Sequence, residues 1–192
     1  MNIGLYFGSF NPIHNGHLII ASEVAYKENI DQVWMVVSPQ NPHKNNNSLL
    51  NEWHRLHLVQ LAVEDDDKLK ASSIEFKLPR PSYTSNTLAY LKENYPQHQF
   101  SIILGSDSFS NLEKWNNYRY IIDNFKLIIY KRPGFEINNK INADLTVLDS
   151  ILLEISSTKI REKIKSGSPI DFWVPKSVAE EIYKNNYYKT SP

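Results

Sequence analysis

Several features are missing from this 192-residue sequence, and each absence excludes a class of protein. There is no cysteine, which excludes a disulfide framework, a zinc ribbon and a cysteine nucleophile. Basic and acidic residues both number 21, so the surplus of basic residues typical of a nucleic-acid-binding protein is absent. No apolar run approaches the ~20 residues of a membrane helix, and the N-terminus resembles no signal peptide. These absences predict a cytoplasmic protein that binds neither nucleic acid nor membranes.

Glycine is also scarce, with six residues, so each is expected where the backbone demands it. Hydrophobic residues make up 41% of the chain, which is enough for a packed core. The length suits one domain rather than two, and no linker rich in proline, glycine or serine divides the chain. We therefore predict a single domain over residues 1–192.

Short apolar runs alternate with helical patterns along most of the chain. The runs are typical of strands buried on both faces, and they occupy Ile3–Phe7, Val33–Val37, Ser72–Phe76, Phe100–Leu104, Lys126–Tyr130 and Leu145–Leu148. The helical patterns cover Gly16–Glu28, Asn51–Glu64, Ser85–Asn94, Ser108–Ile121 and Ser157–Lys165. Gly167 is a stop signal, and a capping box of Ser177 and Glu180 begins a last helix that runs to about Asn185. This order predicts an α/β fold, a Rossmann-like doubly wound parallel sheet with a helical C-terminal segment.

The loop after the first predicted strand, from Gly8 to His17, has the sequence GSFNPIHNGH. Ligands of open α/β sheets bind beyond the carboxyl ends of strands, and Gly8 would let the backbone approach one closely. Gly16 lies at the predicted helix start, where free N–H groups favour an anion. His14 and His17 would share a helix face and donate hydrogen bonds to phosphate oxygens. The alternatives are a metal site or two surface residues.

A second histidine pair, His54 and His57, has the same spacing inside a predicted helix and is interpreted as structural. The first pair differs because a strand, glycines and a proline accompany it. Attack of one phosphate on the α-phosphorus of a nucleotide suits such a loop, since it needs positioning and charge stabilisation more than a covalent group. The chain has no P-loop pattern.

The last predicted strand is followed by a second motif, SSTKIR, from Ser156 to Arg161. Its hydroxyl groups can cap a helix and face an anion. Arg161 lies about one helical turn after Ser157, from where a guanidinium can fork onto two phosphate oxygens. Alone, the pattern is more typical of a plain cap with a solvated arginine. Lys44 and Arg132 follow the second and fifth predicted strands as further basic candidates, and an isolated lysine is usually solvated.

Further candidates lie on the loops around two later predicted strands. Pro81–Thr84 precedes a helix, and its backbone and aromatic ring suit a flat ligand that carries a carboxylate. Gly105 closes a strand and allows close approach, and Asp107 can accept hydrogen bonds from ribose hydroxyls. Trp115 lies further on, and without a family it is best interpreted as core.

Two of these motifs resemble the signatures of the nucleotidyltransferase superfamily. The run GSFNPIHNGHL resembles its H-x-G-H loop, which class I aminoacyl-tRNA synthetases share in related form. The run ISSTKIR is similar to the second signature of the adenylyl-transferring branch, which binds the β- and γ-phosphates of ATP. We predict catalytic roles for His14, His17, Lys44 and Arg161. We predict ATP contacts at Gly8, Ser9, Phe10, His14, Gly16, His17, Gly105, Asp107, Ser156, Ser157, Thr158 and Arg161.

The spaced set as a whole resembles the bacterial nicotinate mononucleotide adenylyltransferases over almost the whole chain. The resemblance implies that Tyr83 and Thr84 contact the nicotinate carboxylate and that Trp115 stacks on the pyridine ring. It also places Lys44 near the phosphates, and we add Arg132 as a nucleotide contact. Many relatives have aspartate where this chain has Asn11, which removes one negative charge near the site.

The implied activity is transfer of AMP from ATP to nicotinate mononucleotide, which yields deamido-NAD and pyrophosphate in NAD biosynthesis. Mg²⁺ would be carried with ATP, because the sequence holds no evident carboxylate cage and predicts no metal site of its own. One alternative keeps the reaction but uses nicotinamide mononucleotide or phosphopantetheine as acceptor. Another is a catalytically silent nucleotide-binding module. The oligomeric state, including a homo-oligomer, stays open.

Overall fold

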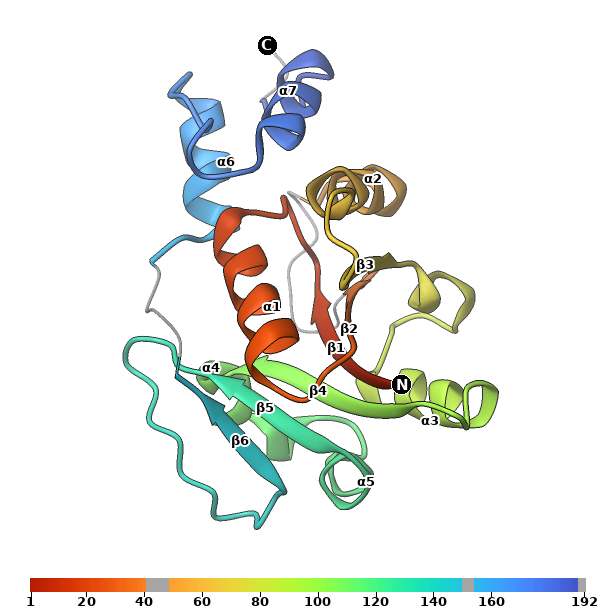
Figure 1. Cartoon of the computed structure of the whole chain (residues 1–192). Helices are drawn as coiled ribbons and strands as arrows, with labels where there is room; N and C mark the ends of the chain where they lie inside the picture. The colour runs from red at the N-terminus through yellow and green to blue at the C-terminus, as the bar shows by residue number, and fades with distance from the viewer. Residues whose placement is uncertain (41–48, 150–153, 190–192) are drawn as a thin grey trace.

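One parallel sheet organises the molecule in the computed structural model, which describes residues 1–40, 49–149 and 154–189 (Figure 1). Over these residues the strand order is β3-β2-β1-β4-β5-β6. The strands are β1 (Asn2–Gly8), β2 (Gln32–Val37), β3 (Leu69–Ser72), β4 (Gln99–Gly105), β5 (Lys126–Tyr130) and β6 (Leu145–Leu148). The chain builds β1, β2 and β3 toward one edge, then returns to place β4 beside β1 and continues toward the other edge. The predicted doubly wound sheet is therefore confirmed.

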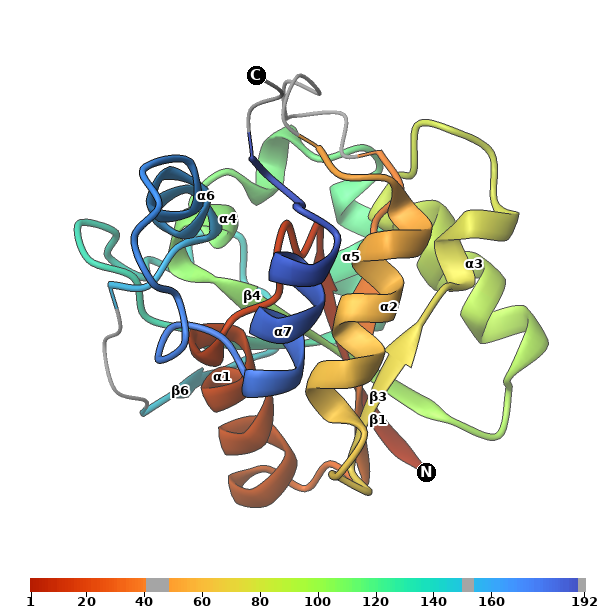
Figure 2. The same cartoon turned by 90° about the horizontal axis from the view of Figure 1, so that it is seen from above.

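Helices cover both faces of this sheet (Figure 1, Figure 2). One face carries α1 (Asn15–Lys27) and α2 (Glu52–Val63). The other carries α3 (Thr84–Asn94), α4 (Ser106–Phe109) and α5 (Tyr118–Asn124), with 3-10 turns at Ile74–Lys77 and Leu112–Lys114. The last two helices, α6 (Ser157–Lys165) and α7 (Lys176–Lys184), lie beyond the carboxyl ends of the strands, and α7 packs along α2. No helix of the described ranges is long and apolar enough to cross a membrane.

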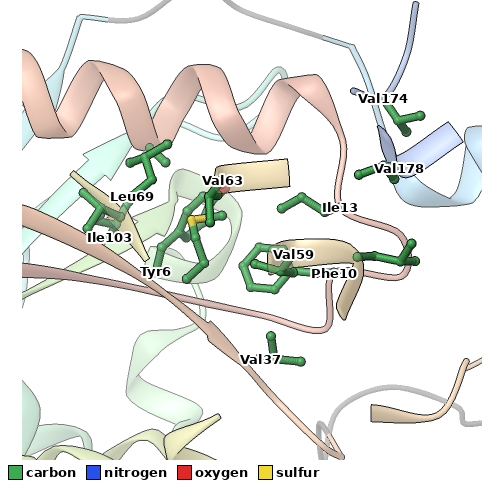
Figure 3. Packing of buried hydrophobic residues seen from close by; sticks show 14 of the residues in the cluster. Tyr6, Phe10, Ile13, Val37, Val59, Val63, Leu69, Ile103, Val174 and Val178 are labelled. Carbon is green, nitrogen blue, oxygen red and sulfur yellow. The ribbon is translucent and has the colours of Figure 1, made fainter. Parts of the chain in front are cut away.

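The core has two layers, one on each side of the sheet, because side chains alternate along each strand. Along β1, Ile3 and Leu5 enter one layer and Tyr6 enters the other. Figure 3 shows the layer of Tyr6, a single cluster of buried side chains that includes Tyr6 and Ile103 of the sheet, Val59 of α2 and Val178 of α7. The C-terminal helices are therefore part of the main core, and this burial holds them against the sheet.

Most predicted strands and helices are confirmed to within two residues, and Lys126–Tyr130, Leu145–Leu148 and Ser157–Lys165 match residue for residue. Helix α6 ends as predicted, since Gly167 has a φ of +72° and Ser168 N–H donates to Lys163 O at 2.8 Å. The predicted strand Ser72–Phe76 is wrong. The strand lies at Leu69–Ser72, and the alternating apolar residues after it form a 3-10 turn whose Phe76 packs on Trp53.

Two further predictions about helices are wrong. The helix expected over Ser108–Ile121 is divided into α4, a 3-10 turn and α5, because Trp115 is extended and Asn117 is left-handed with a φ of 50°. Asparagine tolerates that conformation, which ends one helix and begins the next. The capping box at Ser177 and Glu180 does not form. Pro175 occupies the cap of α7, and the Ser177 hydroxyl donates to Leu61 O at 3.2 Å.

Candidate active site

A cavity of about 460 Å³ lies beyond the carboxyl ends of β1 and β4, where the direction of sheet winding reverses. Most of the residues predicted for the site line it. They are Gly8, Ser9, Phe10, His14, His17, Tyr83, Thr84, Asp107, Trp115, Arg132, Ser156, Ser157, Thr158 and Arg161. A second cavity of about 310 Å³ borders the first and shares six wall residues with it, namely Tyr6, His14, His17, Tyr130, Arg132 and Ser156.

Two of the predicted residues that the structure describes, Gly16 and Gly105, do not line the first cavity, and Gly16 lines the second. A third predicted residue, Lys44, lies outside the described residues. Gly105 lines neither of these two cavities, and the structure gives its lack of a side chain a reason that the sequence did not indicate. A Cβ atom there would collide with the Asp107 carboxylate and lie 3.2 Å from Arg132 Nε. Glycine therefore makes room for neighbouring side chains, and its contact with ATP stays a prediction.

His14 is the N-cap of α1 rather than a residue within the helix, so the predicted shared helix face is wrong in detail. Its Nδ1 accepts a hydrogen bond from the His17 N–H at 3.3 Å, and the two rings nevertheless stack 3.6 Å apart. Burial, assisted by the positive charge of Arg132, lowers the pKa of His14 from 6.5 to about 3. The imidazole is therefore neutral at pH 7. Because Nδ1 accepts, its hydrogen is on Nε2, which is a hydrogen-bond donor without net charge.

The aromatic rings of Phe10 and Tyr6 pack against His17. The Phe10 ring lies 5.0 Å from the His17 ring, nearly perpendicular to it, and the Tyr6 ring lies 6.0 Å away. Phe10 is almost fully buried. Its ring also packs edge-on to that of Tyr6, 5.9 Å away, and its contact with ATP stays a prediction. The packing fixes the His17 ring at the cavity wall.

The second motif is joined to the first by hydrogen bonds that span almost the whole sequence. Arg161 Nη1 donates to Asn11 O at 2.8 Å, and Ser157 Oγ donates to Pro12 O at 2.9 Å. Ser156 caps α6, since its hydroxyl accepts from the Lys159 N–H at 3.3 Å. The N-terminus of α6 and one guanidinium therefore face the same cavity as the histidines, an arrangement that is chemically suited to an anion.

Arg132 stands where the two cavities meet, and Tyr130 and Asp107 hold it there. Its backbone N–H donates to Ser106 Oγ at 2.9 Å, and its Nε pairs with Asp107 Oδ1 at 3.5 Å. Its Nη2 donates to the Tyr130 hydroxyl at 3.4 Å, and that hydroxyl accepts from Tyr6 at 3.2 Å. Sequence reasoning missed both tyrosines. Their place at the carboxyl ends of predicted strands is the signal that was available.

The opposite end of the cavity is formed by Tyr83 and Thr84 at the N-terminus of α3 and by the partly buried Trp115. Glu75 is a further wall residue that sequence reasoning missed, because its segment was predicted as a strand. It is 1% exposed, and its carboxylate accepts from Thr87 Oγ1 at 2.9 Å. Burial raises the pKa of Glu75 above its ordinary value.

Few carboxylates line the two cavities: among the described residues, Asp107 and Glu75 line the first and Glu154 lines the second. Within the described ranges, no three His, Cys, Asp or Glu residues gather closely enough to hold a metal ion alone. This donor set fits a hard cation that brings most of its oxygen ligands with it as phosphates and water.

Comparison with known sequences places these features in a known class. Residues 5–163 match the sequence model of the cytidylyltransferase-like family. The chain, with its doubly wound sheet and its two motifs joined at one cavity, therefore belongs to this family of nucleotidyltransferases.

Individual relatives narrow the class. The chain is 50% identical to a "probable nicotinate-nucleotide adenylyltransferase" of Flavobacterium johnsoniae, over 98% of this chain and 100% of the relative. It is 36% identical to a protein of the same name from Bacillus licheniformis, over 98% of both chains. Within the broader family, the chain therefore belongs to the nicotinate-nucleotide adenylyltransferases.

A solved structure confirms the fold. The nicotinic acid mononucleotide adenylyltransferase of Plasmodium falciparum, in complex with NaAD, superposes with a TM-score of 0.81 over 97% of both chains. Its sequence is 22% identical, so this likeness concerns the fold.

Proposed function

We propose that the chain acts as one nucleotidyltransferase domain over residues 1–192, which transfers AMP from ATP to nicotinate mononucleotide in NAD biosynthesis. The products are nicotinate adenine dinucleotide and pyrophosphate. The observation that carries this proposal is the meeting of two phosphate motifs in one cavity, where Arg161 of α6 donates to the carbonyl of Asn11 in the loop after β1. The family membership supports the same activity.

In this reaction a phosphate oxygen of nicotinate mononucleotide attacks the α-phosphorus of ATP in line. The new P–O bond forms as the bond to the bridging oxygen of the β-phosphate breaks, and pyrophosphate leaves. The residues need only hold the groups and stabilise developing charge. Neutral His14 donates through Nε2, His17 lies stacked on it, and the Arg161 guanidinium binds the leaving phosphates. Ser156, Ser157 and Thr158 place the N-terminus of α6 on the same oxygens.

The acceptor would lie at the opposite end of the cavity. The N-terminus of α3, an 11-residue helix that begins at Thr84, favours the nicotinate carboxylate. Tyr83 lies beside it, and Trp115 offers an aromatic face for the pyridine ring. Arg132, between the cavities, would contact a phosphate. The role of Lys44 stays a prediction.

Mg²⁺ carried by ATP fits the isolated carboxylates of the cavity walls, and Asp107 is the residue that would hold it alongside the phosphates. When bound, the ion would neutralise part of the phosphate charge. Cytoplasmic location and self-association stay predictions.

Pyrophosphate release tests the proposal. Purified protein is mixed with ATP, Mg²⁺ and, in parallel, nicotinate mononucleotide, nicotinamide mononucleotide or phosphopantetheine. We expect turnover with the nicotinate acceptor and formation of the dinucleotide in equal amount. Turnover only with another acceptor would reassign the substrate. A folded protein that binds ATP but releases no pyrophosphate with any acceptor would support the silent binding module instead.

A further inference from the structure

Arg55, in the first turn of α2, is a fully buried cation and is 0% exposed. Its four side-chain hydrogen bonds to residues that the structure describes all end on backbone carbonyl oxygens. Nε donates to Leu50 at 2.8 Å, Nη1 to Ser9 at 2.6 Å and to Ser38 at 2.8 Å, and Nη2 to Pro39 at 2.9 Å. None of the carboxylates in the part of the chain that the structure describes forms an ion pair with it.

The four carbonyls belong to three separate backbone segments beside the active site. Ser9 lies in the loop after β1, Ser38 and Pro39 directly follow β2, and Leu50 precedes α2. Ser9 and Ser38 also line the cavity. The guanidinium thus lies directly behind the cavity wall and joins the histidine loop to the neighbouring strand and helix.

Filling the core does not require an arginine at position 55, whereas pairing the four carbonyl oxygens does. Leu58 and Val59, on the same helix, fill the core with apolar side chains. A buried charge is unfavourable unless hydrogen bonds replace its water, and an apolar residue would leave these carbonyls unpaired. The planar guanidinium offers five donors in a rigid fork, whereas a lysine offers three from one point. Burial lowers the pKa of Arg55, Tyr188 and Glu52 act in the opposite direction, and Arg80 adds a smaller lowering effect. Arg55 stays charged because the ordinary pKa of an arginine lies far above neutral pH.

We propose that Arg55 is a positioning residue for the adenylyl transfer. By holding the carbonyls of Ser9 and Ser38, it keeps the loop that carries His14 and His17 in the geometry that faces the phosphates. It acts through that loop and not by contact with substrate. The inference deepens the proposed function and rests on it for its kinetic readout.

Chemical rescue provides the test. Arg55→Ala should lower kcat at least tenfold, because a small misplacement of aligned groups is costly in rate. Guanidinium at about 20 mM, far below denaturing concentrations, should enter the space left by the side chain and raise kcat about fivefold or more. Methylammonium chloride at the same concentration should not. Leu58→Ala is the matched control, since it removes a buried side chain from the same helix away from the loops, and it should lower the melting temperature with kcat nearly unchanged.

Three results would overturn the proposal: Arg55→Ala with unchanged kcat, no specific rescue by guanidinium, or an equal loss of kcat in Leu58→Ala. If Arg55→Ala does not fold, Arg55→Lys replaces it. A lowered kcat at the wild-type melting temperature then supports positioning, and a retained kcat overturns it. If the wild-type protein shows no turnover, the proposed function fails. Positioning is then tested by ATP titration of the same variants, where weakened binding restored by guanidinium supports it and unchanged binding overturns it.

Discussion

The two ends of the active-site cavity are built in different ways. At the phosphate end, side chains are held by hydrogen bonds to backbone: His14 accepts from the His17 N–H, and Arg161 and Ser157 donate to carbonyls of the loop after β1. At the acceptor end, Trp115 follows a three-residue 3-10 turn and is partly buried. The nearby Asn116 side chain is exposed and accepts from Ser85 at 3.2 Å.

This difference matches the role proposed for each end, phosphate binding at one and acceptor recognition at the other. Stabilising charge at a transition state requires donors that are already in place, because any reorganisation would cost rate. Recognising an acceptor requires a fitting shape and a face for the ring. Substitutions at the phosphate end should therefore change kcat, and substitutions at the acceptor end should change KM for one substrate. The following experiments test that division.

The largest effect is expected at His17, whose ring is packed between Phe10 and His14. His17→Ala should lower kcat by about 10²–10³-fold, the usual loss when one preorganised donor is removed. Pyrophosphate release at saturating concentrations of both substrates measures it. An unchanged kcat would remove His17 from the chemistry and abolish the contrast between the ends.

A smaller loss is expected for Arg161→Lys, which keeps the charge but not the fork that reaches Asn11 O. We expect kcat/KM for ATP to fall by about 10–100-fold, as for other lost charge-assisted hydrogen bonds. Lys165→Ala, an exposed change at the far end of the same helix, is the control and should have wild-type kinetics. Wild-type kinetics in Arg161→Lys as well would mean that charge alone is needed there.

At the acceptor end, Trp115→Ala should raise KM for nicotinate mononucleotide about tenfold, the effect of losing one ring-stacking partner. KM for ATP should change by less than about twofold, because the ring lies at the other end of the cavity. Trp53→Ala, at an exposed tryptophan that lines neither cavity, is the matched control. Equal changes in the two KM values would show that the ends are not separate.

The smallest effect concerns stability and the neutrality of His14. In the unfolded chain this histidine binds a proton below pH 6.5, whereas in the folded protein it binds one only near pH 3. Its contribution to stability therefore falls as the pH falls through that window. We expect a loss of about 0.7 kcal/mol between pH 7 and pH 6, rising to about 1.4 kcal/mol for each further pH unit down to about pH 3.

His14→Asn isolates this contribution, because asparagine keeps the cap of α1 but does not titrate. Urea unfolding of both proteins at pH 7, 6 and 5 gives the difference in the free energy of unfolding. A variant with the same pH dependence as the wild type would contradict the lowered pKa.

Much of the fold follows from local patterns in the sequence. The apolar runs that became β5 and β6 have the predicted bounds, and the order of strands and helices indicated a parallel sheet. Prediction failed where a short pattern suited two structures. The apolar alternation after Ser72 suited a strand or a 3-10 turn, and the break at Asn117 depends on a left-handed residue that no helical period reveals.

The sequence by itself determined which chemical groups the site contains, because the motifs from Gly8 to His17 and from Ser156 to Arg161 occur at strand ends and helix starts, which are local features. Tertiary structure alone decided the state and support of those groups. His14 is neutral because packing buries it beside Arg132, and Arg161 meets Asn11 only because the C-terminal helices pack back on the sheet. Tertiary packing likewise places Glu75 in the cavity wall and Arg55 behind the loop, where it donates to Ser9 O. Burial and contact between distant segments depend on the whole folded chain, and no local spacing encodes them.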